Sequence, residues 1–212
     1  MADAPLTLFI DDYWISPYAM SAFVALEEKG LPYSVVEVAL HEKAHQQLGY
    51  VARTGRVPSL QHGDFTLAES SAISEYLADT YPHPKYPRLF PENLQHRAVA
   101  RELMAWVRSD LMPIREERAT HTIFYDRAKA PLSTKGEAAK KRLIDALTPL
   151  IRGTTLFGTW CIADTDVAVM LQRLNVNGDG LPPAMKAFAE ANWQRPSVQK
   201  WVSHARKPYQ PY

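Results

Sequence analysis

The chain has 212 residues, of which 46% are hydrophobic and 22% charged, and its formal net charge is +1. This composition supports a buried core and excludes global disorder, and the near-neutral charge gives no reason to expect a nucleic-acid partner. The sequence contains neither an apolar run long enough for a membrane helix nor the basic and apolar regions of a signal peptide. A single cysteine, Cys161, excludes an internal disulfide and a paired-cysteine metal site. We therefore expect a cytoplasmic protein with no membrane, nucleic-acid or metal partner.

The charges divide the chain into two parts. Residues 1–82 carry 4 lysines and arginines against 11 aspartates and glutamates, whereas the remainder carries 20 against 12. An acidic first third and a basic remainder indicate two differently built units. The alternative is two solvated surfaces of opposite sign.

Short runs rich in strand-forming residues alternate with helical patterns in the first third of the chain. Ser16 is a favoured helix N-cap, Pro17 suits the first helical position, and Gly30 ends the pattern. Residues 62–64 form a turn typical of a hairpin. The expected elements are strands at 6–10, 33–40, 57–60 and 65–67, a helix between Ser16 and Gly30, a helix capped by Ser70 or Ser71, and a loop or short helix at 41–49.

The remainder of the chain is predicted to be helical. Four prolines between Pro82 and Pro91 indicate a stiff linker, and no convincing strand follows it. Apolar residues then recur at helical spacing, with Pro113 placed to kink the first long helix. The expected helices lie at 97–108, 135–151, 163–174, 183–191 and 196–205. The fold class is therefore a small α/β unit followed by an all-helical unit.

Three places in the first third could hold a small charged ligand. Ser16 begins a helix directly after a strand, where unpaired N–H groups and the helix dipole favour an anion. A cis bond at Pro58 would turn the backbone of Val57 outward to pair with an extended peptide, although trans is the commoner case. Glu69 and Ser70, at the next helix start, suit the ammonium and carboxylate groups of an amino-acid head group. Ordinary helix capping is the alternative at both helix starts.

The order of these features is similar to that of the cytosolic glutathione transferases, over essentially the whole chain and nearest to bacterial serine-type, theta and zeta members. The resemblance implies a thioredoxin-like glutathione-binding domain at 1–82, a linker at 83–94, an all-helical domain at 95–212 and a cis bond before Pro58. It is carried by Ser16-Pro17-Tyr18, Arg56-Val57-Pro58, Glu69-Ser70-Ser71-Ala72-Ile73 and Ile162-Ala163-Asp164.

The resemblance also implies a role for each candidate residue. Ser16 would donate a hydrogen bond to the glutathione sulfur, and the backbone of Val57 would pair with the cysteinyl part of the tripeptide. Glu69 and Ser70 would hold the γ-glutamyl head group, and Arg56 would lie near the glycyl carboxylate. A homodimer is expected, with glutathione as co-substrate and a small electrophile or peroxide as its partner.

The energetics favour a hydrogen-bond donor over a base. A free thiol has a pKa of about 8.5, and lowering it by about 2 takes about 2.7 kcal/mol. A hydroxyl bonded to an anion supplies roughly 1.5–3 kcal/mol and a helix start about 0.3–1 kcal/mol. Because the first turn from Ser16 has no cysteine, glutathione itself would attack an electrophile, hydroperoxide or disulfide. Tyr13 and Tyr18 are competing donors.

Several residues beyond these motifs have open or structural interpretations. Glu116, Glu117 and Arg118 are expected on a solvated helix face. Asp164 stands three residues after Cys161, which predicts a capping box and two structural side chains. The roles of Arg108, Asp110 and Arg115 stay open, and the candidate lining of an electrophile pocket between the units is Trp14, Trp106, Met112, Ile114 and Phe124.

Three functions compete on this basis. The leading one is a glutathione transferase involved in detoxification, with peroxidase or disulfide reductase side activity. The second is a glutathione-dependent isomerase or dehalogenase of the same fold. The third is a non-catalytic interaction protein, which should have lost the residues that hold the head group. Ser16, Pro58, Glu69 and Ser70 are all present, which favours an enzyme.

Overall fold

The computed structural model describes residues 4–42 and 53–210, and the chain divides into two compact units. The first takes in the chain up to Leu89 together with the C-terminal residues from Lys200 onward, and the second is Phe90–Gln199. The end of the chain therefore groups with the α/β unit and not with the helices that precede it in sequence.

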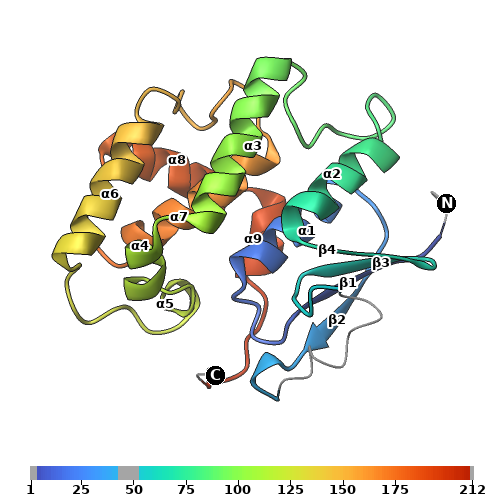
Figure 1. Ribbon diagram of the computed structural model, residues 1–212, viewed down its shortest axis with the longest axis horizontal. Helices are drawn as coiled ribbons and strands as arrows, with labels where there is room; N and C mark the ends of the chain where they lie inside the picture. Colours follow the sequence, from blue (N-terminus) through green and yellow to red (C-terminus); the bar gives the residue numbers. More distant parts are fainter. Residues whose placement is uncertain (1–3, 43–52, 211–212) are drawn as a thin grey trace. The chain divides into compact units, whose positions relative to one another are not determined.

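In the part of the first unit that the structure describes (Figure 1), a four-stranded mixed sheet packs with the helices α1 (Pro17–Lys29) and α2 (Ser70–Thr80). Its strands are β1 (Leu6–Asp11), β2 (Ser34–Val38), β3 (Ser59–His62) and β4 (Phe65–Ala68), in the spatial order β2-β1-β3-β4. β1 runs parallel to β2 and antiparallel to β3, and β3 is antiparallel to β4. The helices α1 and α2 contact each other and the sheet, so they cover the same face. The expected thioredoxin-like unit is confirmed.

Local sequence signals define both ends of α1. The Oγ of Ser16 accepts a hydrogen bond from the N–H of Ala19 at 3.2 Å, and Pro17 takes the first helical position. At the other end Gly30 adopts the left-handed conformation, with φ 63°, that a side chain would disfavour. The N-cap and the terminating glycine both agree with the prediction.

Two details of the first unit differ from the sequence reading or extend it. Glu69 is the cap residue of α2 and Ser70 its first helical residue, so the helix begins one residue earlier than a serine cap requires. A 3₁₀ turn at Leu40–Glu42 follows β2, and most of the stretch expected as a loop or short helix at 41–49 lies outside the described residues.

The proline-rich segment after α2 is irregular, as its composition predicts. The ammonium group of Lys29 donates to the carbonyl of Tyr81 at 2.6 Å, and the side chains of Tyr81 and Leu89 are buried. The chain is thus anchored to the first unit at both ends of this segment before Phe90 opens the second unit.

The second unit is helical throughout its regular structure, and α7 (Ile162–Asn175) forms its centre (Figure 1). Every residue of α7 from Ile162 to Leu174 is buried, and the helix contacts four of its neighbours. No helix within the described ranges combines the length and apolar content needed to cross a bilayer. The surrounding helices are α3 (Leu94–Ser109), α4 (Met112–Glu117), α5 (His121–Phe124), α6 (Thr134–Leu147) and α8 (Pro183–Trp193), and α9 (Pro196–Val202) follows them.

The expectation of one long helix kinked at Pro113 was wrong. α3 ends at Ser109, Leu111 adopts a left-handed conformation with φ 58°, and Pro113 lies in the first turn of the separate helix α4. Proline suits a helix start because the N–H that it lacks has no partner there in any case. The short helix α5 was not expected from the sequence.

Candidate functional site

The register of the sheet brings the candidate segments to one edge. Phe9 of β1 pairs with Ser59 of β3, and Ser59 in turn pairs with Ala68 of β4. These residues form a row across three strands. Just beyond this row lie the three segments singled out from the sequence, namely the loop before α1, the segment before β3 and the start of α2.

The hydroxyl of Ser16 stands at the start of α1 on a half-buried side chain. Its oxygen accepts the hydrogen bond from the N–H of Ala19. A hydroxyl has one proton and two lone pairs, so this bond leaves the proton available to donate. Accepting a bond from the helix backbone also strengthens the hydroxyl as a donor, because chains of hydrogen bonds polarise one another.

A buried carboxylate, missed by the sequence analysis, holds the loop before Ser16. Asp11 is 0% exposed, and its two oxygens accept the N–H of Ile15 at 2.8 Å and that of Ser16 at 3.1 Å. Its carbonyl accepts the N–H of Trp14, which adopts a left-handed φ of 54°. Burial raises the pKa of Asp11 to about 6, against the lowering effect of the two N–H donors. The signal in the sequence was an acidic pair, Asp11-Asp12, directly after a buried strand.

The segment before β3 lies at the same edge. The bond between Val57 and Pro58 is cis, as expected. The hydroxyl of Ser59 donates to the carbonyl of Arg56 at 2.8 Å and so ties the turn to the strand. The side chain of Arg56 is exposed.

The start of α2 has unusual backbone geometry. Glu69 adopts φ 72° and ψ 117°, and its exposed side chain makes no capping bond. A non-glycine residue held in such a conformation costs of order 1–3 kcal/mol and points to a functional constraint. Ser70 is buried at the first helical position, and its carbonyl accepts the hydroxyl of Ser74. The first N–H groups of α2 thus face the edge without a side-chain cap from Glu69.

Comparison with known proteins identifies the family. The model for the glutathione S-transferase N-terminal domain matches residues 12–85, and that for the glutathione S-transferase C-terminal domain matches residues 93–207. The chain belongs to the glutathione S-transferase family. The resemblance inferred from the sequence is thereby confirmed.

Three proteins similar to this chain carry different names. A glutathione transferase homolog from Burkholderia GL BGR1, crystallised with bound glutathione, is 41% identical and has a TM-score of 0.78 over 95% of this chain and 97% of that one. The stringent starvation protein A homolog of Histophilus somni is 28% identical over 93% of this chain and 90% of its own length. The maleylacetoacetate isomerase of Rattus norvegicus is 27% identical over 72% of this chain and 68% of its own length.

The two tyrosines that compete with Ser16 as hydrogen-bond donors differ in how far they are exposed. Tyr13 is 1% exposed, and its ring packs edge-on against Tyr209 and beneath the ammonium group of Lys207. A side chain sealed in this way does not present a hydroxyl to a ligand on the surface. Tyr18 is half-buried in the first turn of α1 and stays a second candidate donor.

The apolar pocket candidates separate into core and surface residues. Trp14 and Ile114 are buried, and the indole N–H of Trp14 donates to the carboxylate of Glu37 at 2.7 Å. Trp14 and Ile114 are therefore core residues of their units. Met112 is exposed, and Phe124 stacks on Trp193 within the helical unit.

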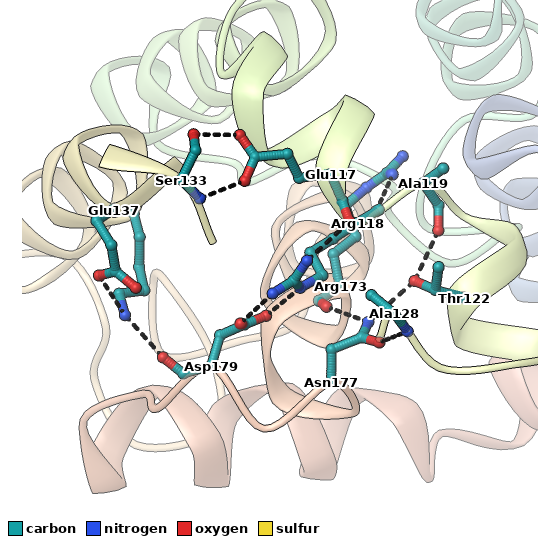
Figure 2. Close-up of polar contacts among 11 residues, drawn as sticks. Glu117, Arg118, Ala119, Thr122, Ala128, Ser133, Glu137, Arg173, Asn177 and Asp179 are labelled. Atoms are coloured by element: carbon teal, nitrogen blue, oxygen red, sulfur yellow. Dashed lines mark hydrogen bonds and ion pairs between the residues drawn. The ribbon is translucent and has the colours of Figure 1, made fainter. Parts of the chain in front are cut away.

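Of the three charged residues expected on a solvated helix face, Arg118 is buried in the second unit, whereas Glu117 is half-buried. Arg118 is 3% exposed, and its guanidinium binds both carboxylate oxygens of Asp179 at 2.6 Å (Figure 2). The carboxylate of Glu117 accepts both the N–H and the hydroxyl of Ser133. The expectation failed for Arg118 because its partner Asp179 lies 61 residues away, and helical spacing carries no information about so distant a partner.

The charged residues left open also have structural partners in the second unit. Arg108 pairs with Asp166 at 2.6 Å and donates to the carbonyl of Met104. Asp110 pairs with Arg142. Arg115 donates to the carbonyl of Arg108 at 2.7 Å. These contacts tie α3 to α7, α6 and α4, which assigns the side chains to the helical scaffold.

The cysteine and its neighbouring aspartate close the start of α7. Both oxygens of the fully buried Asp164 accept backbone N–H groups, from Leu156 and Cys161, each at 2.7 Å. Burial raises the pKa of the Cys161 thiol well above its usual range, so the sulfur stays protonated and unreactive. Over the described residues, no cluster of three or more His, Cys, Asp or Glu side chains forms a candidate metal site.

Proposed function

We propose that the protein binds glutathione at the edge of the first unit and uses the Ser16 hydroxyl to stabilise the glutathione thiolate. The single observation that carries this proposal is the N-cap geometry of Ser16, whose oxygen accepts the Ala19 N–H and whose proton is left to donate. The sulfur anion receives that proton as a hydrogen bond and lies at the positive end of the α1 dipole.

The rest of the tripeptide binds to the segment before β3 and to the start of α2. The exposed carboxylate of Glu69 meets the ammonium group of the γ-glutamyl head, and the N–H groups that open α2 at Ser70 meet its carboxylate. The backbone of Val57 pairs with the cysteinyl part in the manner of an added strand. The exposed guanidinium of Arg56, the residue directly before Val57, binds the glycyl carboxylate.

The reaction begins when the bound thiol releases its proton to solvent. The thiolate then attacks an electrophilic carbon, a carbon–sulfur bond forms, and the leaving group departs with the electron pair of its former bond. With a hydroperoxide, the thiolate takes the terminal oxygen, the oxygen–oxygen bond breaks, and the alkoxide is protonated by water. A second glutathione thiolate attacks the resulting sulfenic acid and releases hydroxide, so that both electrons come from glutathione.

Removal of the hydroxyl tests the proposal. For Ser16→Ala we expect about a 10- to 100-fold fall in kcat/KM, because a hydrogen bond to an anion is worth roughly 1.5–3 kcal/mol. Aryl halides, cumene hydroperoxide and small disulfides form the substrate panel. Ultraviolet titration of the bound thiol should show its pKa return toward that of free glutathione.

Ser133→Ala is the matched control. Ser133 caps α6 with the same geometry, since its Oγ accepts the N–H of Gly136 at 3.1 Å. Both variants lose a cap worth about 1 kcal/mol of stability, but only Ser16→Ala should lose thiolate. Equal thiolate in the Ser16→Ala and wild-type complexes would refute the serine mechanism. Absence of glutathione binding in the wild type would favour a non-catalytic interaction protein.

A glutathione-dependent isomerase is the second candidate, favoured by the similarity to the rat maleylacetoacetate isomerase. An isomerase of this kind would add glutathione to a carbon–carbon double bond, allow the resulting single bond to rotate, and then release glutathione unchanged. Turnover of a cis-enedione acid without net consumption of glutathione distinguishes it from conjugation.

We also propose that the protein works in the cytoplasm as a homodimer. The acidic first third and basic remainder can pair across two copies, and such pairing weakens as salt screens it. Sedimentation at low and high salt tests this, and a monomer at low salt would contradict it.

A further inference from the structure

The loop that leads to Ser16 is held from two sides, and one of them is the far end of the chain. On the inner side, the fully buried Asp11 takes up the N–H groups of Ile15 and Ser16. Because Ser16 is the cap residue, its N–H and its hydroxyl belong to one short piece of backbone. A change in the hydrogen bond from the Ser16 N–H to Asp11 therefore displaces the Ser16 hydroxyl as well.

On the outer side lies the C-terminal strap, defined here as residues 203–210. The guanidinium of Arg206 donates from Nε and Nη2 to the carbonyl of Trp14, at 3.2 and 3.1 Å. The same group also donates to the carbonyls of Trp201, Val202 and His204. One planar group thus connects a carbonyl of the loop with carbonyls at the end of α9 and in the strap itself.

Further contacts of the strap follow the same loop residue by residue. The ammonium group of Lys207 pairs with the carboxylate of Asp12 and lies 4.5 Å from the centre of the Tyr13 ring. The ring of His204 stacks on Trp14 with centroids 3.6 Å apart and planes 14° apart. The strap therefore contacts Asp12, Tyr13 and Trp14 in succession.

These contacts have a common geometric consequence. Trp14 adopts a left-handed conformation that a bulky residue does not favour, and it keeps that conformation only if its surroundings hold it. Its N–H is bonded to the Asp11 carbonyl and its own carbonyl to Arg206. The peptide group before this strained residue is therefore held by the main chain of Asp11. The peptide group after it is held by Arg206 at its carbonyl and by the Asp11 carboxylate at the N–H of Ile15.

We propose that Asp11 and Arg206 are positioning residues for Ser16. The Asp11 carboxylate holds the N–H groups of Ile15 and Ser16, the Arg206 guanidinium holds the Trp14 carbonyl, and together they set the direction of the Ser16 hydroxyl. This inference rests on the proposed function, since it assigns a purpose to the orientation of the Ser16 hydroxyl. It makes the thiolate site dependent on the last residues of the chain.

The experiment measures bound thiolate at neutral pH by ultraviolet absorbance, together with the Kd for glutathione, in full-length variants. For Asp11→Asn we expect about a tenfold loss of thiolate, and for Arg206→Met a smaller loss of about threefold. The Kd should change less than the thiolate in both, because the groups that hold the head group are untouched. Arg206→Lys should restore part of the loss, since one donor can still reach the Trp14 carbonyl.

Two control variants separate positioning from general damage. Asp164→Asn alters a fully buried carboxylate that also accepts two backbone N–H groups, but in the other unit. Lys200→Met removes an ion pair between the C-terminal region and Glu27 of α1 without touching the loop. Both should keep wild-type thiolate. Loss of thiolate in Asp164→Asn equal to that in Asp11→Asn would overturn the proposal.

A readout without glutathione distinguishes failure of the positioning role from failure of the proposed function. Hydrogen exchange of the Ile15 and Ser16 amides should quicken in Asp11→Asn and in Arg206→Met, and not in the controls. Unchanged exchange and thiolate in Arg206→Met would overturn the inference even if Asp11→Asn failed to fold. If Ser16→Ala alone lost thiolate, the serine mechanism would stand and only the positioning role would fall. If thiolate were absent from the wild type while exchange responded as expected, the serine mechanism would fall, and with it the purpose assigned to the two residues, although their hold on the loop would be established.

Discussion

The starts of α1 and α7 are both held by the carboxylate of a buried aspartate, but only the start of α1 keeps a cap hydroxyl with a proton to donate. Each helix follows a loop folded over a completely buried aspartate, Asp11 or Asp164, whose two oxygens accept two backbone N–H groups. Burial raises the pKa of both carboxyls. The difference lies in where the aspartate stands relative to the helix.

In α7 the aspartate is inside the first turn and bonds back to the cap residue, so the helix start is closed by its own side chain. In α1 the aspartate stands at the end of β1, outside the helix, and leaves the cap position to a half-buried serine. The pKa shift alone therefore does not mark the site. What distinguishes α1 is a cap hydroxyl that still has a proton to donate.

The largest expected effect is a loss of unfolding free energy when Asp179, which follows α7, is changed. It tests whether this region is part of the structural scaffold. Replacing Asp179 with Asn leaves the buried Arg118 guanidinium without its full ionic partner. Breaking such a pair costs about 3–5 kcal/mol. Urea unfolding of Asp179→Asn should show this loss, and kcat/KM below the unfolding range should stay within about threefold of wild type. A selective loss of catalysis would contradict the assignment of this region to the scaffold.

The next effect is a pH dependence specific to Asp11. Its pKa is about 6 in the folded chain, against 3.8 for an aspartate side chain in water. Because the folded value is raised, protonated Asp11 stabilises the fold at low pH, and this contribution is lost as the pH rises through about 6. The difference amounts to about 3 kcal/mol. Wild type should lose stability relative to Asp11→Asn between about pH 4 and about pH 7.

Asp12 is the charged neighbour that opposes ionisation of Asp11, while the N–H groups of Ile15 and Ser16 favour it. Unfolding curves of both proteins across this range provide the measurement. A stability difference that stays constant with pH would show that Asp11 titrates normally.

A smaller loss of stability is expected when Asp164 becomes Asn. One of the two N–H groups that it accepts, from Leu156 or Cys161, then faces an amide N–H in a buried place. An unsatisfied buried donor costs about 1–3 kcal/mol. Denaturant unfolding should show that loss without a change in the pKa of bound glutathione. A shift of that pKa would break the comparison between the two helix starts.

The smallest expected effect is a gain in unfolding free energy. Cys161→Ser places a hydroxyl, a better acceptor than a thiol, at the N-cap of α7. We expect about 0.5–1 kcal/mol of added stability. Thermal unfolding measures it, with unchanged activity as the second readout because the thiol is buried and protonated. A loss of activity would assign the sulfur a role that the structure gives no reason to expect.

The sequence by itself determined the elements that depend on near neighbours. The Ser16 cap, Pro17, the Gly30 terminus and the pairing of Cys161 with Asp164 are local signals, because a cap or a turn is decided within a few residues. The order of strands and helices followed from the same signals. The candidate residues of the glutathione site came from motifs within that order, and their roles remain predictions.

Only the tertiary structure decided which groups support the site and which build the scaffold. Arg206 reaches Trp14 across 192 residues, and Arg118 reaches Asp179 across 61. Asp11 sits beside its partners in sequence, yet its burial depends on the sheet and on α1 around it. Periodicity and capping rules describe one segment at a time, whereas a buried charge is stabilised by whatever distant segment the fold brings to it.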